Sequence, residues 1–493
     1  MEYISTRSNR EPIKGSQAIL RGISPDGGLY LPKALPLIDN LEDLLSLNYR
    51  QMALYVLKKF FPELGKERLK NAVNKAYDEK FSAGPVKIRR TKQVNFLELY
   101  HGPTLAFKDM ALALLPHLLK ASKDLENIKE DIIILTATSG DTGKAALEGF
   151  ANVEGVKIIV FYPKEGVSQV QELQMVTQEG KNTLVVGVKG NFDDTQSGVK
   201  TIFNDVDFKE RLRENNYIFS SANSINIGRL VPQIIYYIYA YCQMVNKGDI
   251  SLGERINIVV PTGNFGNILA AYYAKRMGLP VNKLICASND NNVLTEFLNK
   301  RRYDIRRDLI LSSSPSMDIL ISSNLERLIF HLNQKDHQLV KDKMDELEIK
   351  GHYQIENMEL DDFYGDYANE EEVSRAIYEV FKEENYLIDP HTAVAYGVYK
   401  KYLRKSQDKT KTLVASTASP FKFGKKVASS IGLDISDKDE FEILDMMSRI
   451  WKVELPESIK TLREKEVLHE TVALKEKMKE SVETFLRVGD QND

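Results

Sequence analysis

The sequence has few of the residues that build disulfide frameworks or metal sites. It contains two cysteines, Cys242 and Cys286, and seven histidines. The two cysteines lie far apart in apolar surroundings and cannot form a disulfide framework, and the scattered histidines lack metal-ligand spacing. We therefore expect a protein of a reducing compartment, with no metal bound.

The sequence also lacks a long apolar run and an excess of charge. The stretch IIYYIYAY (234–241) is far shorter than the roughly 20 residues that span a membrane. The first residues, MEYISTRSNREP, have no apolar core of a signal peptide. The net charge of −3 gives no electrostatic reason to expect nucleic acid or an anionic membrane as a partner. These features predict a cytoplasmic protein without membrane or nucleic-acid partners.

The length and composition indicate an ordinary globular chain with more than one domain. The 493 residues are 43% hydrophobic and 28% charged, enough for about two or three domains. The turn-rich passage SPDGGLYLPKALP and two helical patterns precede the linker SAGPVKIRR, which predicts a separate unit over 1–85. The main α/β region is expected over 86–430, and a helical extension over 431–493. Within that extension, helical spacing from Val467 to Phe485 predicts an amphipathic helix packed on the main body.

Between about 90 and 300, short apolar runs alternate with helical segments. DIIILTAT, KIIVFYP and RINIVVPT each precede a stretch with helical spacing. This alternation predicts βαβ units and a parallel sheet covered on both faces. Ligands bind such sheets outside the carboxyl ends of the strands. Because SGDTG, GNFGN and SSAN all follow strands, we expect these loops to form one site.

Lys108, in HGPTLAFKDM, is the leading candidate for a reactive residue. It stands where a turn meets an apolar helical run. Cations are disfavoured near a helix N-terminus, and burial lowers the pKa of an ammonium, which frees an amine for Schiff-base chemistry. A solvated surface lysine is the common alternative for any single lysine.

Two loops have the composition of anion-binding turns. GNFGN predicts a cradle for a single phosphate, because its spacing departs from the dinucleotide fingerprint; a plain strand-to-helix turn is the alternative. TATSGDTGKAA resembles a nucleotide P-loop, but Thr138 stands where that motif needs its first glycine and Ala145 where it needs Ser or Thr. Its hydroxyl-rich turn suits a carboxylate bound by Ser139, Thr142 and backbone amides, and a simple helix cap is the alternative.

Eight motifs in a fixed order carry a resemblance to a known family. They are HGPTLAFKDM, ATSGDTGKAALEGF, GNFDD, NSINIGRL, PTGNFGN, SPSMDI with SSN and ER, DPHTAVA, and ASTASPFKF. Together they resemble threonine synthases, pyridoxal-phosphate enzymes of the tryptophan-synthase-β fold type (fold-type II). The resemblance runs from STRSN to about residue 425. It implies parallel-sheet α/β domains with an N-terminal domain and a helical C-terminal tail.

The resemblance implies roles for individual residues. Lys108 would form a Schiff base with pyridoxal 5'-phosphate, and Thr417, or Ser416 beside it, would offer a hydroxyl to the pyridine nitrogen. The cofactor phosphate would lie on Gly263, Asn264, Phe265, Gly266 and Asn267. The substrate carboxylate would lie on Ser139, Gly140, Asp141, Thr142 and Gly143, with Asp141 shaping the loop. Candidates for the substrate phosphate are Asn191, Lys200, Asn223, Ser224, Asn226 and Arg229.

The implied reaction converts O-phospho-L-homoserine and water to L-threonine and phosphate, in a monomer or homodimer. A serine or threonine dehydratase of the same fold is one alternative, and a non-catalytic relative that binds a phosphorylated metabolite is another. His101 and His391 are weaker candidates for proton transfer, because a lone histidine usually serves packing. SPSMDI is consistent with either a structural turn or a loop near the site.

Overall fold

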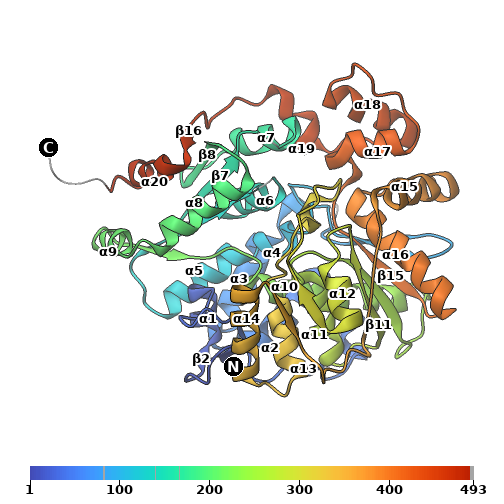
Figure 1. The fold of residues 1–493 in the computed structure, drawn as a ribbon, viewed down its shortest axis with the longest axis horizontal. Helices are drawn as coiled ribbons and strands as arrows, with labels where there is room; N and C mark the ends of the chain where they lie inside the picture. The colour runs from blue at the N-terminus through green and yellow to red at the C-terminus, as the bar shows by residue number, and fades with distance from the viewer. Residues whose placement is uncertain (82–83, 139, 166, 489–493) are drawn as a thin grey trace.

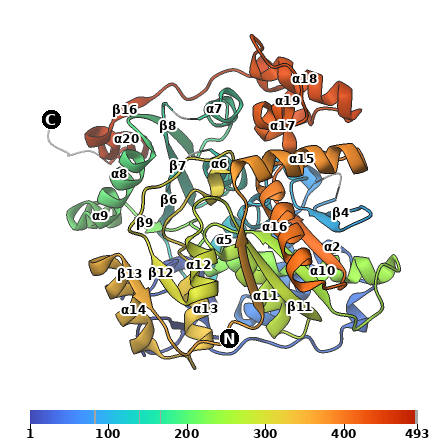
Figure 2. The ribbon, with the colours of Figure 1, turned by 45° about the vertical axis from the view of Figure 1, so that its right-hand side comes forward.

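Two sheets form the body of the molecule in the computed structural model, which describes residues 1–81, 84–138, 140–165 and 167–488 (Figure 1). The five-stranded sheet has the order β16-β8-β7-β6-β9, and all its neighbouring strands are parallel. Its strands are β6 (Asp131–Ala137), β7 (Val156–Pro163), β8 (Thr183–Lys189), β9 (Tyr217–Ser220) and β16 (Val472–Leu474). This sheet belongs to the upper lobe in Figure 2.

The six-stranded sheet lies in the lower lobe and has the order β14-β11-β10-β15-β5-β4. Only the pair of β4 (Lys87–Arg90) with β5 (Asn95–Glu98) is antiparallel among its described strands. The others are β10 (Ile256–Pro261), β11 (Val281–Ser288), β14 (Phe363–Tyr367) and β15 (Thr412–Ser416). Every residue of β10 is buried, as expected for a parallel strand with helices on both faces.

Helices cover both sheets. The upper lobe carries α6 (Asp141–Phe150), α7 (Gln169–Val176), α8 (Phe192–Asn204) and α9 (Val206–Glu214). The remaining helices of the main region are α4 (Asp109–Leu112), α5 (Leu115–Leu125), α10 (Ile227–Asn246), α11 (Gly266–Arg276), α12 (Val293–Lys300), α13 (Leu325–Leu332), α14 (His337–Lys350), α15 (Glu370–Glu384) and α16 (Pro390–Ser406). A two-stranded ribbon pairs β12 (Arg302–Asp304) with β13 (His352–Gln354). In the described part of the chain, no helix is long and apolar enough to cross a membrane.

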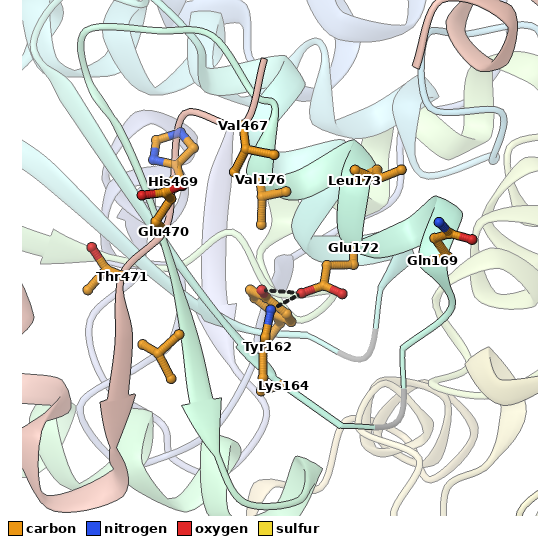
Figure 3. A pocket seen from close by; sticks show the side chains of 11 residues that line it. Tyr162, Lys164, Gln169, Glu172, Leu173, Val176, Val467, His469, Glu470 and Thr471 are labelled. Carbon is orange, nitrogen blue, oxygen red and sulfur yellow. Dashed lines mark hydrogen bonds and ion pairs between the residues drawn. The ribbon is translucent and has the colours of Figure 1, made fainter. Parts of the chain in front are cut away.

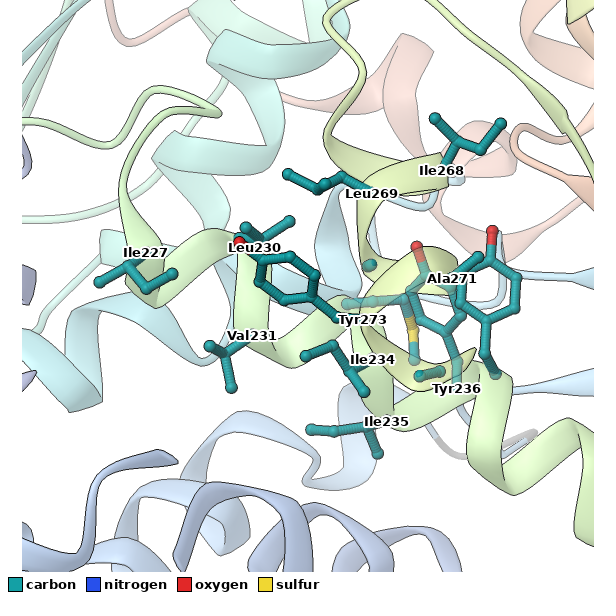
Figure 4. Packing of buried hydrophobic residues seen from close by; sticks show 14 of the residues in the cluster. Ile227, Leu230, Val231, Ile234, Ile235, Tyr236, Ile268, Leu269, Ala271 and Tyr273 are labelled. Carbon is teal, nitrogen blue, oxygen red and sulfur yellow. The ribbon is translucent and has the colours of Figure 1, made fainter. Parts of the chain in front are cut away.

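The first 81 residues fold against the lower lobe. They contain an antiparallel sheet of β1 (Glu2–Ser5), β2 (Ile13–Lys14) and β3 (Tyr30–Pro32), and the helices α1 (Gly15–Arg21), α2 (Tyr49–Phe60) and α3 (Lys66–Ala76). Their buried residues, such as Tyr3 and Phe60, belong to the same hydrophobic cluster as α10 and α11. Figure 4 shows Ile234 and Tyr236 of α10 beside Ala271 and Tyr273 of α11 in this cluster. The tyrosines of IIYYIYAY are thus mostly core residues.

The C-terminal part departs from the expected single helix. It forms α17 (Gly424–Ser430), α18 (Glu440–Trp451), α19 (Glu457–Lys460) and α20 (Met478–Leu486). The expected helix exists only as α20, whose Met478 and Val482 pack on the upper sheet. The helical spacing was wrong for Val472–Leu474, which form β16 because the edge of β8 offers unpaired backbone groups.

Candidate active site

Lys108 lies at the start of α4 with its side chain only 10% exposed. Its Nζ donates to Ser316 Oγ at 2.9 Å and lies 3.7 Å from Asp141 Oδ2. Burial lowers the pKa of Lys108; the charge of Asp141 opposes this, while Lys422 and Arg229 lower the pKa further. The expected desolvated lysine is therefore present, in surroundings that favour its neutral amine.

The turn that carries Lys108 is tied to the end of β15. The backbone N–H of Phe107 donates to the carbonyl of Thr417 at 2.8 Å. Thr417 is buried, and no hydrogen bond of its hydroxyl is seen among the described residues. The neighbouring Ser416 hydroxyl instead lies 3.1 Å from Thr392 Oγ1. Of the two hydroxyls expected near the pyridine nitrogen, Thr417 is thus the one left for a ligand.

The loop after β10 presents a series of backbone amides. Within the described chain, the N–H groups from Gly263 to Ile268 have no acceptor, and Leu269 is the first to bond back, to Phe265. Phe265 adopts the left-handed conformation (φ 61°) and caps α11, whose dipole adds to the attraction for an anion. These residues form an anion cradle at the carboxyl end of β10.

A turn at Ser316 joins the cradle to Lys108. A Cβ atom at Gly263 would lie 2.6 Å from the Ser316 carbonyl oxygen, so only glycine fits there. The Ser316 hydroxyl on the same turn accepts from Lys108. The Lys108 amine and the amide cradle thus lie on the two sides of one turn. This arrangement fits a cofactor whose aldehyde reacts with the amine and whose phosphate binds to the amides.

The loop after β6 places a carboxylate beside Lys108. Asp141 Oδ1 lies 2.7 Å from Lys422 Nζ. Burial raises the pKa of Asp141, but the charges of Lys422 and Lys108 outweigh it and hold this pKa well below its usual value. Thr138 Oγ1 accepts from the N–H groups of Gly140 and Gly143 at 3.0 and 2.9 Å. Ser139 lies outside the described residues, and Thr142 is half-buried in the first turn of α6.

Arg229, in the first turn of α10, has a buried guanidinium with few partners. The residue is 5% exposed, Nη1 donates to the Ala222 carbonyl at 2.8 Å, and Nε is buried without a partner. Burial alone lowers its pKa to about 10. No carboxylate among the described residues pairs with it. A buried cation without a counter-ion is costly, so the arrangement fits an anionic ligand.

The other residues expected at the substrate phosphate differ in their surroundings. The Asn226 side chain accepts from the Gly228 N–H and donates to the carbonyls of Ile19 and Ser221. The Asn226 side chain is thus used as a cap that joins α10 to α1, and its assignment to a substrate phosphate stays a prediction. Asn223 is exposed and Ser224 half-buried in the same loop.

The two candidates on α8 stand apart from the cluster. Asn191 is exposed and caps α8 by accepting from the Asp194 N–H, and Lys200 is exposed on the same helix. No contact within the described chain joins either residue to Lys108 or Arg229. Their assignment to a substrate phosphate stays a prediction.

Lys422 and Ser316 contribute to the site without having been expected there, and so does His391, which was only a weaker candidate for proton transfer. His391 Nε2 accepts from the Ser316 N–H at 3.3 Å, and Nδ1 lies 2.7 Å from Asp389 Oδ2. Because a backbone N–H can only donate, His391 carries its proton on Nδ1 and holds the Ser316 turn. The three residues stand in the motifs ASTASPFKF, SPSMDI and DPHTAVA, but no spacing rule connects such distant residues.

A separate pocket of about 400 Å³ lies between α7 and residues 467–472 (Figure 3). Tyr162 and Lys164 both donate to Glu172 inside it. His469 Nε2 lies 2.9 Å from the Gln178 carbonyl, and neither Lys108 nor Arg229 lines the pocket.

Three family models cover most of the chain. "Threonine synthase N terminus" matches residues 2–77, "Pyridoxal-phosphate dependent enzyme" residues 89–418, and "Threonine synthase, C-terminal" residues 392–485. Human threonine synthase-like 1 is 40% identical over 84% of the chain, and the chain spans 58% of its length. Threonine synthase of Saccharomyces cerevisiae is 33% identical over 87% of the chain and 89% of its own length.

Solved structures give the same result. The pyridoxal-phosphate-bound threonine synthase of Brucella melitensis is 33% identical, with a TM-score of 0.88 over 99% of this chain and 100% of that one. The yeast threonine synthase also has a TM-score of 0.88, at 32% identity over 99% of both chains. The resemblance, the fold class and the cofactor expected from the sequence are therefore confirmed. The chain belongs to the threonine synthase family of pyridoxal-phosphate-dependent enzymes.

Proposed function

We propose that this enzyme converts O-phospho-L-homoserine and water to L-threonine and phosphate. The carrying observation is Arg229, a buried guanidinium without a counter-ion that acts on the pKa of Lys108. With the amide cradle at 263–268, the site offers places for two phosphates. A cofactor phosphate accounts for one of them, and a phosphorylated substrate accounts for the other. A dehydratase substrate, with no phosphate, leaves Arg229 unpaired.

The bound cofactor supplies an electron sink for the carbon chain of an amino acid. The residues of this chain bind and orient the reactants around it. Lys108 holds the cofactor aldehyde and, once released, moves protons at Cα and Cβ of the substrate. The N–H groups of the cradle bind the cofactor phosphate, and the Thr417 hydroxyl is the hydrogen-bond partner of the pyridine nitrogen.

The loop from Gly140 to Gly143 holds the substrate carboxylate through the N–H groups of Asp141 and Thr142 at the start of α6, because those of Gly140 and Gly143 donate to Thr138. Arg229 holds the phosphate that leaves, so both ends of the substrate are fixed while Lys108 reaches the carbons between them. Two free, buried cysteines in the described chain support a cytoplasmic, reducing environment. We propose a monomer or homodimer as the active form.

The test measures phosphate and threonine formed from O-phospho-L-homoserine by wild type, Lys108→Ala and Arg229→Met, all with added pyridoxal phosphate. Lys108→Ala should lose activity while retaining its circular dichroism spectrum. Arg229→Met should retain bound cofactor but lose about 100-fold in kcat/KM, since a charge-assisted contact contributes roughly 1.5–3 kcal/mol. Arg302→Met, at a surface ion pair, is the control.

Turnover of serine or threonine by wild type, with none of the phosphorylated substrate, would identify a dehydratase instead. Wild-type activity unaffected by Arg229→Met would remove Arg229 from the phosphate site and leave the reaction in place.

A further inference from the structure

Lys422 is a buried lysine to which the proposed chemistry assigns no step. Its side chain is 0% exposed, within the short turn Pro420–Phe423 after β15. Nζ donates to the Thr104 carbonyl at 2.8 Å and pairs with Asp141 Oδ1 at 2.7 Å. A buried ion pair contributes little net stability, because removing two charges from water offsets their attraction. Stability alone therefore does not explain why a charged lysine is buried at this position.

Asp141 connects Lys422 to Lys108. One carboxylate oxygen, Oδ1, binds Lys422, and the other, Oδ2, lies 3.7 Å from Lys108 Nζ. Gln171 Nε2 also reaches Oδ1, at 3.4 Å. The carboxylate thus turns one oxygen to each lysine, and the Lys422 turn fixes its orientation.

The charged groups around Lys108 come from several elements. Asp141 of α6 is its anion, while Lys422 from the turn after β15 and Arg229 from α10 are cations. His391 of α16 accepts from the Ser316 N–H and so holds the turn whose hydroxyl accepts from Lys108. The carboxylate of Asp109, the next residue along the chain, accepts hydrogen bonds from the N–H and hydroxyl of Thr104. One carboxylate is therefore shared between two lysines.

We propose that Lys422 is a positioning residue that orients the Asp141 carboxylate and neutralises it, so that Lys108 retains a reactive neutral amine when it is not bound to the cofactor. Without Lys422, the whole charge of Asp141 acts on Lys108 and stabilises its ammonium form. Without Asp141, two lysines repel each other and the ammonium form of Lys108 is disfavoured. The two substitutions have opposite effects on one measurable property, the pKa of Lys108.

This role of Lys422 rests on the proposed function in one respect only, that Lys108 is the reacting amine. Its test uses the full-length chain stripped of cofactor, with no substrate. Traces of acetic anhydride label the lysines at a series of pH values. Mass spectrometry of the peptide that contains Lys108 then gives its pKa. Failure of this test is separate from failure to turn over O-phospho-L-homoserine.

The expected results have opposite signs. Lys422→Met should raise the pKa of Lys108 by about one unit and Asp141→Asn should lower it by about one unit, as expected for charges within about 4–6 Å. The double variant should return close to wild type, because it removes one charge of each sign. Lys144→Met is the matched control: this half-buried lysine of α6 pairs with Glu148 and should leave the pKa of Lys108 unchanged.

A Lys422→Met protein that folds but labels like wild type would overturn the proposal, because a purely structural role changes stability and not the amine of Lys108. If Lys422→Met fails to fold, the labelling of Lys108 in Lys422→Arg and Asp141→Asn tests the proposal. Lys422→Arg keeps the charge and should label like wild type, whereas Asp141→Asn should lower the pKa of Lys108. An unchanged or raised pKa in Asp141→Asn would overturn the proposal.

Discussion

At the scale of single residues, Asp109 shows how the Lys108 turn links stability to pH. Its side chain is buried and accepts from the N–H and hydroxyl of Thr104. Burial raises its pKa from 3.8 to about 6. Between about pH 4 and pH 6 the folded protein therefore holds a proton that the unfolded chain has lost. Because the folded state binds more protons there, the free energy of unfolding falls as the pH rises through this window.

We expect Asp109→Asn to remove this dependence. The amide oxygen keeps an acceptor for the Thr104 N–H and has no charge to bury. The free energy of unfolding at pH 7 should rise by up to about 3 kcal/mol, and its slope between pH 4 and pH 6 should lose the contribution of one proton. Urea unfolding across pH 4–7 measures both effects, with exposed Asp361→Asn as control. An unchanged slope would contradict the assignment.

At the scale of elements, the start of α11 and the Ser316 turn act as one unit. Asn324, just before α13, reinforces it, because its N–H and Nδ2 both donate to the Asn264 carbonyl, at 3.1 and 2.9 Å. These two hydrogen bonds fix the loop, and the N–H groups of the cradle therefore keep one orientation. Cofactor affinity should therefore depend on the contact between Gly263 and this turn.

We expect Gly263→Ala to weaken cofactor binding without unfolding the protein. The new Cβ would meet the Ser316 carbonyl at 2.6 Å, and one backbone must move. Overpacking of this kind costs roughly 1–3 kcal/mol, which corresponds to about a 5- to 150-fold rise in the Kd for pyridoxal phosphate. Titration of the cofactor-free protein by absorbance measures it. Gly397→Ala, on α16, is the control, and equal affinities in the two variants would show that the contact does not matter.

At the scale of the whole molecule, Arg327 joins three parts of the chain. It is fully buried, and its guanidinium donates to the carbonyls of Tyr30 and Ile225 and to Asn324 Oδ1. Tyr30 belongs to β3 of the N-terminal sheet, and Ile225 to the loop before α10. Arg7 strengthens the same junction through its pair with Glu326 at 2.7 Å. The N-terminal sheet is thus attached to the loop that leads into Arg229.

We expect Arg327→Met to destabilise the whole protein by about 3–5 kcal/mol, because it leaves several buried carbonyl groups without donors. Thermal and urea unfolding should both show the loss, and limited proteolysis should cut the first 81 residues faster. The surface variant Arg302→Met should behave like wild type. A variant with wild-type stability would show that the junction does not depend on this guanidinium.

The sequence by itself determined much of this protein. Alternating apolar runs and helical spacings predicted the parallel α/β architecture, because each element must bury one face or both. Gly263 and its neighbours could be recognised as an anion cradle, and Lys108 as a desolvated amine, since these properties depend on adjacent residues. The strand Val472–Leu474 could not be found this way, because its conformation depends on the free edge of β8, nearly 300 residues earlier in the chain.

Only the tertiary structure decided which charged and polar side chains lie close enough to interact. The pairing of Asp141 with Lys422, the hold of His391 on the Ser316 turn and the unpaired guanidinium of Arg229 join residues that lie far apart in sequence. Spacing rules describe one helix or one loop, whereas electrostatic energies depend on distance and burial in space. The roles of Lys422 as a partner of Asp141 and of Asn226 as a cap therefore became visible only once the chain was folded.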